Sequence, residues 1–173
     1  MAGHSDRTRE MPAFDPAPKI AIVIAAYYDA ISTAQLDAAR RVLNGVGAAH
    51  ETVEVPGSLE IPPAIVRLNR LGDYDGYVAL GCVIRGATSH YDVVVNESAR
   101  GLTLLGLQGL AIGNGIITVE TMAQAEERAD AARLNTAGGA AEAALHLIAL
   151  ERRLTTSPST FGFARQAPGQ DRP

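Results

Sequence analysis

Residues 78–107, VALGCVIRGATSHYDVVVNESARGLTLLGL, contain the alternation that decides the fold of this chain. The stretch opens with an apolar run over 78–84, whose length and continuity are typical of a β-strand buried on both faces. Small and polar residues follow, and from residue 89 onward apolar side chains recur at helical spacing. The stretch therefore predicts a strand, a short loop and a helix.

The same alternation continues in both directions along the chain. Further strand-like segments are KIAIVIAA at 19–26, HETVEV at 50–55 and LAIGNGIIT at 110–118. Helical spacing is found at 31–46, at 62–71 and, in two pieces broken near 135–139, at 121–151. Strands and helices in this order predict an α/β fold, with a four-stranded parallel sheet covered by helices on both faces. Such sheets bind ligands at the carboxyl ends of their strands, so the loops there are the expected place for functional residues.

Composition narrows the class of protein. The chain has 173 residues, 47% of them apolar and 20% charged, which are values typical of one globular domain. The formal net charge of −4 gives no chain-wide basic surface for nucleic acid, and no apolar run reaches the roughly 18 residues of a membrane helix. The single cysteine, Cys82, excludes an internal disulfide and a multi-cysteine metal site. We therefore expect neither nucleic acid nor a membrane as a partner.

The two ends of the chain differ in composition from the segment between them. Residues 1–18 are polar and contain three prolines, and residues 155–173 are rich in Ser, Thr, Pro, Gly and Gln. We expect a flexible N-terminal arm at 1–18, one ordered domain at 19–154 and a flexible C-terminal tail at 155–173. The opening MAGHSDRTRE lacks an apolar signal core, so a cytoplasmic location is expected.

The loops after the first two strands carry candidate binding residues. Tyr27 and Tyr28 follow the first strand, where a tyrosine ring can stack on a planar ligand or pack at the rim of the core. The second strand leads into VPGSLEIPP at 55–63, whose prolines favour a helix that begins near residue 61 or 62. The carboxylate of Glu60 can accept hydrogen bonds from a polyol or complement the helix N-terminus, and both interpretations stay open.

The loop after the third strand has the features of a phosphate site. Gly86, Ala87, Thr88 and Ser89 are small residues before a helix, where backbone N–H groups and a hydroxyl can approach an anion. His90 follows as a possible proton carrier, although a histidine here can also be an ordinary surface residue. Arg128, in the last part of the chain, can bind phosphate or pair with a neighbouring carboxylate.

Three motifs together resemble the lumazine synthase family of riboflavin biosynthesis. They are VPGSLEIP at 55–62, GCVIRGATSHYD at 81–92 and TVETMAQAEERA at 118–129, in the order and at the spacing of that family. The resemblance implies a flavodoxin-like three-layer α/β/α sandwich. It also implies the condensation of 5-amino-6-(D-ribitylamino)uracil with 3,4-dihydroxy-2-butanone 4-phosphate, which yields 6,7-dimethyl-8-ribityllumazine, phosphate and water. No metal and no organic cofactor is expected.

The family forms homo-pentamers with active sites between neighbouring subunits. The Gly-Asn-Gly at 113–115 resembles the second type of the family, which pairs pentamers into decamers. The resemblance therefore implies that Asn114 contacts the pyrimidine of an adjacent subunit, and that Arg128 reaches the phosphate across the same interface.

The remaining roles implied by the resemblance fall on residues of the motifs. Tyr27 would stack on the pyrimidine ring, and the turn of Ser58, Leu59 and Glu60 would bind the ribityl chain. The backbone of Cys82, Val83 and Ile84 would read the pyrimidine edge. Ala87 and Thr88 would bind the phosphate, with His90 as the acid and base.

The chain departs from the family pattern at two places. The stretch Asn135-Thr136-Ala137 lacks the lysine of the family's Asn-Lys-Gly, and the first loop reads Ala26-Tyr27-Tyr28 instead of Arg-Phe-Asn. These changes leave open an alternative, a weakly active or inactive paralogue that binds flavin or lumazine. Another alternative, an unrelated phosphosugar enzyme of similar fold, would require the match at 81–92 to be accidental.

Overall fold

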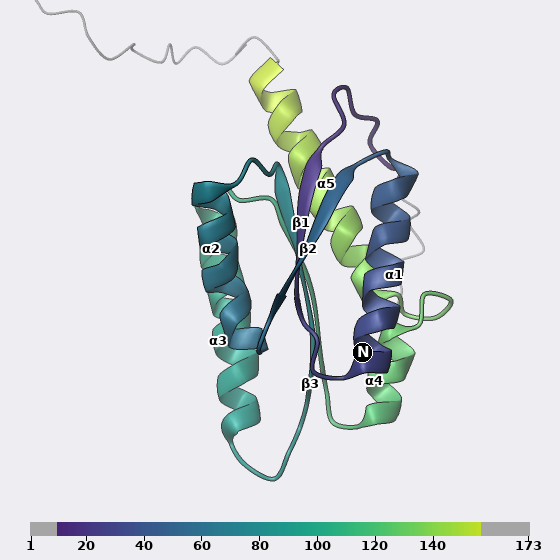
Figure 1. Ribbon diagram of the computed structural model, residues 1–173, viewed down its shortest axis with the longest axis vertical. Helices are drawn as coiled ribbons and strands as arrows, with labels where there is room; N and C mark the ends of the chain where they lie inside the picture. The colour runs from purple at the N-terminus through teal and green to yellow at the C-terminus, as the bar shows by residue number, and fades with distance from the viewer. Residues whose placement is uncertain (1–9, 157–173) are drawn as a thin grey trace, which may run out of the picture.

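The computed structural model describes residues 10–156 of the chain (Figure 1). The predictions for residues 1–9 and 157–173 lie outside this described part. The strands are β1 (Lys19–Ala25), β2 (Ala49–Val55), β3 (Gly76–Ile84) and β4 (Ile112–Val119). The helices are α1 (Asp29–Gly45), the short 3-10 helix η1 (Ser58–Glu60), α2 (Ile61–Leu71), α3 (His90–Leu107), α4 (Met122–Ala129) and α5 (Thr136–Thr156). The predicted alternation of strands and helices is confirmed.

The four strands form one parallel sheet in the order β2-β1-β3-β4. The two central strands, β1 and β3, are almost fully buried, which explains their continuous apolar sequences. The edge strand β2 is mostly exposed and has the more polar sequence. Since β1 and β3 are neighbours whose chains leave toward different edges of the sheet, the crevice at their carboxyl ends is the expected ligand position.

Helices cover both faces of the sheet, so the predicted three-layer arrangement is confirmed. In Figure 1, α2 and α3 lie on one side and α1, α4 and α5 on the other. Alternate residues of β1 enter the two cores: Ile22 packs in the cluster with α1 and α5, and Val23 packs in the cluster with α2 and α3. A third cluster, under α4, surrounds Cys82 and Ile117 near the carboxyl ends of β3 and β4.

Local sequence signals set the starts of two helices. The helix α2 begins at Ile61 with prolines in its first turn, as predicted. A capping box starts α4: the side chain of Thr121 accepts from the backbone of Gln124, whose own side chain accepts from the backbone of Thr121.

The break predicted near 135–139 is wrong in its position, because the helix is interrupted at 130–135 and α5 resumes at Thr136. Asn135 is the residue that ends the interruption, with a left-handed φ of 46°. Gly138 lies inside α5, where a Cβ atom would overlap the amide of Asn135. The glycine is therefore needed for close packing and does not break the helix.

The glycines on either side of Asn114 have a packing role. A Cβ atom on Gly113 would overlap the carbonyl oxygen of Ala140 in α5, and one on Gly115 would lie 3.1 Å from the Cβ of Ala140. Because neither residue has a Cβ atom, α5 can lie directly on the edge strand β4. Asn114 itself is on the opposite face of β4 and is exposed.

Residues 10–18, before β1, run against the domain, and Met11 and Phe14 are partly buried against the core cluster of α1 and α5. The division into an arm, a domain and a tail stays a prediction. None of the helices within residues 10–156 has the length and apolar content needed to cross a membrane.

Candidate active site

A cavity of about 470 Å³ opens at the carboxyl ends of β1, β2 and β3. This end of the sheet is the lower end in Figure 1. Eight residues selected from the sequence line the cavity: Tyr27, Ser58, Leu59, Glu60, Cys82, Val83, Ile84 and His90. They come from four separate segments of the chain, so the fold brings together residues that are predicted from separate loops.

The turn at 58–60 forms one wall of the cavity. Ser58 is buried against β3, and this contact depends on Gly81, because a Cβ atom there would lie 3.0 Å from the Ser58 hydroxyl oxygen. The carboxylate of Glu60 folds back over Gly57, where a Cβ atom would lie 2.9 Å from one of its oxygens. Two glycines thus allow a hydroxyl and a carboxylate to approach the strand ends, where a polyol could bind both.

The end of β3 forms the floor of the cavity. Cys82 is buried, and burial raises the pKa of its thiol to about 11. The thiol is therefore protonated near neutral pH and is not a nucleophile. The neighbouring Tyr28 has a raised phenol pKa, first because of burial and then because of its proximity to Cys82. The floor is an uncharged surface at neutral pH, suited to the flat face or edge of a neutral heterocycle.

Tyr27 lies at the opening of the cavity with 74% of its surface exposed. Its ring meets Tyr28 edge to face, with 4.9 Å between the ring centroids. Because most of its surface is still exposed beside this contact, the Tyr27 ring is available to stack on a planar ligand.

His90 is the first residue of α3, and the exposed loop 86–89 leads into it. The backbone N–H of His90 donates to the hydroxyl oxygen of Thr88 at 3.4 Å, whereas the side chain of Ser89 makes no capping hydrogen bond. The N–H of Asp92 donates to the carbonyl of Ser89 at 3.0 Å, so the turn is partly closed on itself. The loop is exposed at a helix N-terminus, which is the position expected of an anion site.

Four of the predicted site residues do not line this cavity. Ala87 and Thr88 are in the exposed loop next to His90, two to three residues away along the chain. Asn114 is at the exposed edge of β4, beside Leu102 and Thr103 of α3. Arg128 is half-buried on α4. The resemblance assigns Asn114 and Arg128 to the site of a neighbouring subunit, and their positions outside the cavity are compatible with that assignment.

Five further residues line the cavity; none has an assigned role in the predicted site, although Tyr28 is named beside Tyr27 as an aromatic at the strand end. They are Ala25, Tyr28, Pro56, Gly57 and Val94. Four of them lie one or two residues away from a selected residue in the chain, so proximity in the sequence was an available signal. Val94 is one helical turn after His90, and spacing by four residues on a helix was the signal for it. Within residues 10–156 there is no group of three or more His, Cys, Asp or Glu side chains placed to hold a metal ion.

Comparison with known proteins gives the family. The family model described as 6,7-dimethyl-8-ribityllumazine synthase matches residues 17–152. A protein of that name from Jannaschia sp. (strain CCS1) is 68% identical over 163 residues, which cover 94% of this chain and 92% of the relative. Relatives of the same name from Sphingopyxis alaskensis and Methylobacterium radiotolerans are 52% and 49% identical, covering 78% and 88% of this chain and 95% of each relative. The chain therefore belongs to the 6,7-dimethyl-8-ribityllumazine synthase family.

Proposed function

We propose that this chain forms 6,7-dimethyl-8-ribityllumazine in the cavity at the carboxyl ends of β1, β2 and β3. The chain is a transferase of riboflavin biosynthesis that condenses 5-amino-6-(D-ribitylamino)uracil with 3,4-dihydroxy-2-butanone 4-phosphate. The observation that carries the placement is that eight residues selected from separate motifs line one cavity. The relatives compared above are all named as the synthase, and nothing in them supports a flavin- or lumazine-binding paralogue.

The pyrimidine substrate binds in the cavity itself. Its ring stacks on Tyr27, and its edge meets the backbone of Cys82, Val83 and Ile84 on the floor. The ribityl chain extends along the turn of η1, where Ser58 and Glu60 lie. A carboxylate that accepts hydrogen bonds from polyol hydroxyls gives orientation as well as affinity.

The butanone phosphate binds at the start of α3. The backbone around Ala87 and Thr88 and the N-terminal field of α3 hold its phosphate, with Arg128 of a neighbouring subunit as a second contact. A guanidinium can bind two phosphate oxygens at once and stabilise the charge that develops as phosphate departs. His90 lies between this phosphate site and the pyrimidine site.

The reaction follows from these positions. The uracil amine attacks the butanone carbonyl and forms an imine with loss of water; a proton is removed and phosphate leaves. The side chain then turns and the second ring closes with loss of another water. Both substrates are reactive, so holding them together contributes most of the rate, up to about 7–11 kcal/mol in favourable systems. Proton transfer through His90 adds roughly 10²–10⁴-fold.

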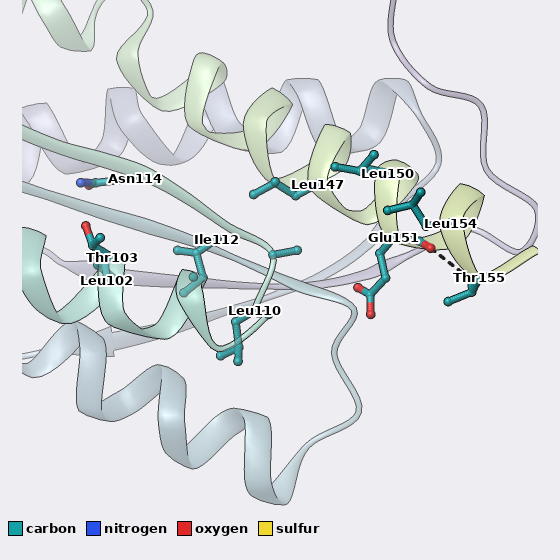
Figure 2. A pocket seen from close by; sticks show the side chains of 13 residues that line it. Leu102, Thr103, Leu110, Ile112, Asn114, Leu147, Leu150, Glu151, Leu154 and Thr155 are labelled. Atoms are coloured by element: carbon teal, nitrogen blue, oxygen red, sulfur yellow. Dashed lines mark hydrogen bonds between the residues drawn. The ribbon is translucent and has the colours of Figure 1, made fainter. Parts of the chain in front are cut away.

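A second copy of the chain covers the edge of the sheet in this proposal. A groove of about 940 Å³ runs along β4 between α3 and α5, and Figure 2 shows Leu147, Leu150 and Leu154 of α5 along it. These leucines are between 41% and 66% exposed, an apolar surface of the kind that a partner covers. Asn114 lies in the same groove, so a copy seated there comes into contact with it. The assembly is a homo-pentamer, paired into a decamer, and its location is cytoplasmic.

Subunit mixing tests the proposed shared site. A His90→Ala assembly and an Arg128→Ala assembly are each expected to have strongly reduced but measurable turnover. When their subunits are mixed during refolding, sites that take His90 from one chain and Arg128 from the other regain both residues. Recovered turnover, followed by lumazine absorbance and phosphate release, supports the shared site. If mixing restores nothing although mixed oligomers form, His90 and Arg128 do not serve one site from two chains.

A charged substitution in the groove tests the proposed assembly. Leu150→Glu places a charge in the apolar groove and is expected to reduce the sedimentation coefficient to that of a smaller species. Leu71→Glu, at an exposed leucine at the end of α2, is the matched control and should sediment like the unaltered chain. An unchanged coefficient for Leu150→Glu would place the interface elsewhere.

A further inference from the structure

The guanidinium of Arg85 joins three parts of the active-site end of the sheet. Its Nε lies 2.9 Å from a carboxylate oxygen of Glu120, and its Nη1 lies 3.1 Å from a carboxylate oxygen of Asp92. Its central carbon lies over the ring of Tyr91, 4.0 Å from the centroid. Such a planar fork can hold two carboxylates and stack on a ring at once, which a lysine cannot do.

These contacts close the loop 86–89 at both ends. At the near end, the backbone N–H of Arg85 donates to the carbonyl of Val119 at 2.9 Å, which extends the pairing of β3 with β4 by one residue. At the far end, the Arg85 side chain holds the first turn of α3 through Tyr91 and Asp92. The four loop residues therefore span two points fixed by the same arginine.

The partner Glu120 is fixed in turn by α4. Its backbone N–H donates to the side chain of Gln124 at 2.9 Å, and Gln124 belongs to the capping box that starts this helix. The Arg85 side chain therefore connects the first turn of α3 to the first turn of α4, across the ends of β3 and β4.

The charges around Arg85 affect how well the neighbouring loop can bind an anion. Asp92 and Glu120 are two carboxylates near the loop that holds Thr88, and their field opposes the binding of phosphate there. Arg85 forms ion pairs with both carboxylates, so its positive charge offsets theirs. We propose that Arg85 is a positioning residue for phosphate binding: it fixes the loop 86–89 and offsets the charges of Asp92 and Glu120, without touching the substrate. This inference rests on the proposed phosphate site at Ala87 and Thr88.

Steady-state kinetics with both substrates test the proposal. Arg85→Gln is expected to raise the KM for butanone phosphate roughly tenfold, the size of one charged hydrogen-bonded contact, and to leave the KM for the pyrimidine unchanged. Arg85→Lys keeps the charge but not the fork, so its KM should lie between those of the native chain and Arg85→Gln. Calorimetric titration with inorganic phosphate should show the same order of affinities in the absence of turnover. A merely structural role would change both KM values or the melting temperature together.

Two comparisons separate the possible failures. Arg100→Gln removes an arginine within α3 that also pairs with a carboxylate, Glu97, and should leave both KM values unchanged. Thr88→Val tests the phosphate site itself. If Thr88→Val raises the KM for butanone phosphate and Arg85→Gln does not, the positioning role is wrong and the site stands. If neither variant changes this KM or the phosphate affinity, the phosphate binds elsewhere and both proposals fail.

Discussion

At the amino ends of the strands, charged side chains pair with one another, whereas at the carboxyl ends the charged and aromatic residues of the cavity lie in exposed loops. Asp75, before β3, accepts from the backbone of Lys19 at 2.8 Å and pairs with Arg152 of α5 at 3.0 Å. Glu51 of β2 accepts from the hydroxyl of Tyr74 at 2.6 Å and pairs with the side chain of Lys19 at 3.4 Å. These contacts connect β1, β2, β3 and α5.

The carboxyl ends have few such connections, apart from those of Arg85. Tyr27, Glu60 and His90 line the cavity and are exposed, and no ion pair within residues 10–156 involves Glu60 or His90. The same parallel strands therefore have one end stabilised by paired polar groups and another where polar groups are left for a ligand. We expect substitutions at the amino ends to change stability and those at the carboxyl ends to change activity.

The largest effect is expected at the carboxyl ends, for His90→Ala. Loss of the proposed proton carrier should reduce kcat roughly 100-fold but leave measurable turnover, because holding the substrates together is expected to contribute the rest. The melting temperature should stay within error of the native chain, since His90 is exposed. The matched control is His50→Ala, at the start of β2, where the ring contacts only the side chain of Asn44 among the described hydrogen bonds. Complete loss of turnover in a correctly assembled His90→Ala protein would contradict this division of labour.

The next effect is expected at the amino ends, for Asp75→Ala. The substitution removes the acceptor of the Lys19 N–H and the partner of Arg152, and should lower the free energy of unfolding by about 1–2 kcal/mol. Its kcat and both KM values should stay unchanged. Thermal unfolding at one protein concentration measures the effect, because assembly makes the melting temperature depend on concentration. Asp73→Ala, at an exposed aspartate two residues earlier, serves as the control. An equal loss of stability in both variants would show that the contacts of Asp75 with Lys19 and Arg152 are not the cause.

The fold was predictable because its signals are local. Apolar runs gave the strands, helical spacing gave the helices, and the parallel order placed the loops 27–28, 56–60 and 85–90 at one end of the sheet. Side chains that act between distant segments were not predictable. Gln35 interrupts an apolar helix face in the sequence, yet it is fully buried and donates to the carbonyls of Gly81 and Gly115 at 3.1 and 2.9 Å.

In the predicted site, too, local patterns identify residues but not the contacts between distant segments. The cavity residues follow from motifs at strand ends, and the loop before α3 follows from its small residues. The pairing of Arg85 with Glu120, 35 positions away, depends on the adjacency of β3 and β4, and no local pattern encodes it. The same holds for the break before α5, where the position of Asn135 depends on packing against Gly138.

The smallest effect concerns Cys82, a buried titratable group at the otherwise open end. Its thiol pKa is raised by burial from 9.0 to about 11, so the folded protein keeps the proton over a range in which the unfolded chain loses it. Stability from this group is therefore fully present below about pH 9 and is lost as the pH rises toward 11. Between pH 9 and 10 the loss should be about 1 kcal/mol, since one pKa unit corresponds to about that free energy.

The thiol must be separated from other groups that titrate in the same range. The pKa values of Tyr28 and Tyr77 are raised too, mainly by burial, and they add to the same alkaline decline in stability. Both proteins keep the tyrosines and the burial that raises their pKa values. The difference in melting temperature between the native chain and Cys82→Ala therefore reports the thiol together with its contribution to the raised pKa of Tyr28. That difference should be constant up to pH 9 and then shift in favour of Cys82→Ala. If it stays constant up to pH 11, the thiol does not titrate differently in the folded protein, and the floor of the cavity is more open to water than the burial of Cys82 indicates.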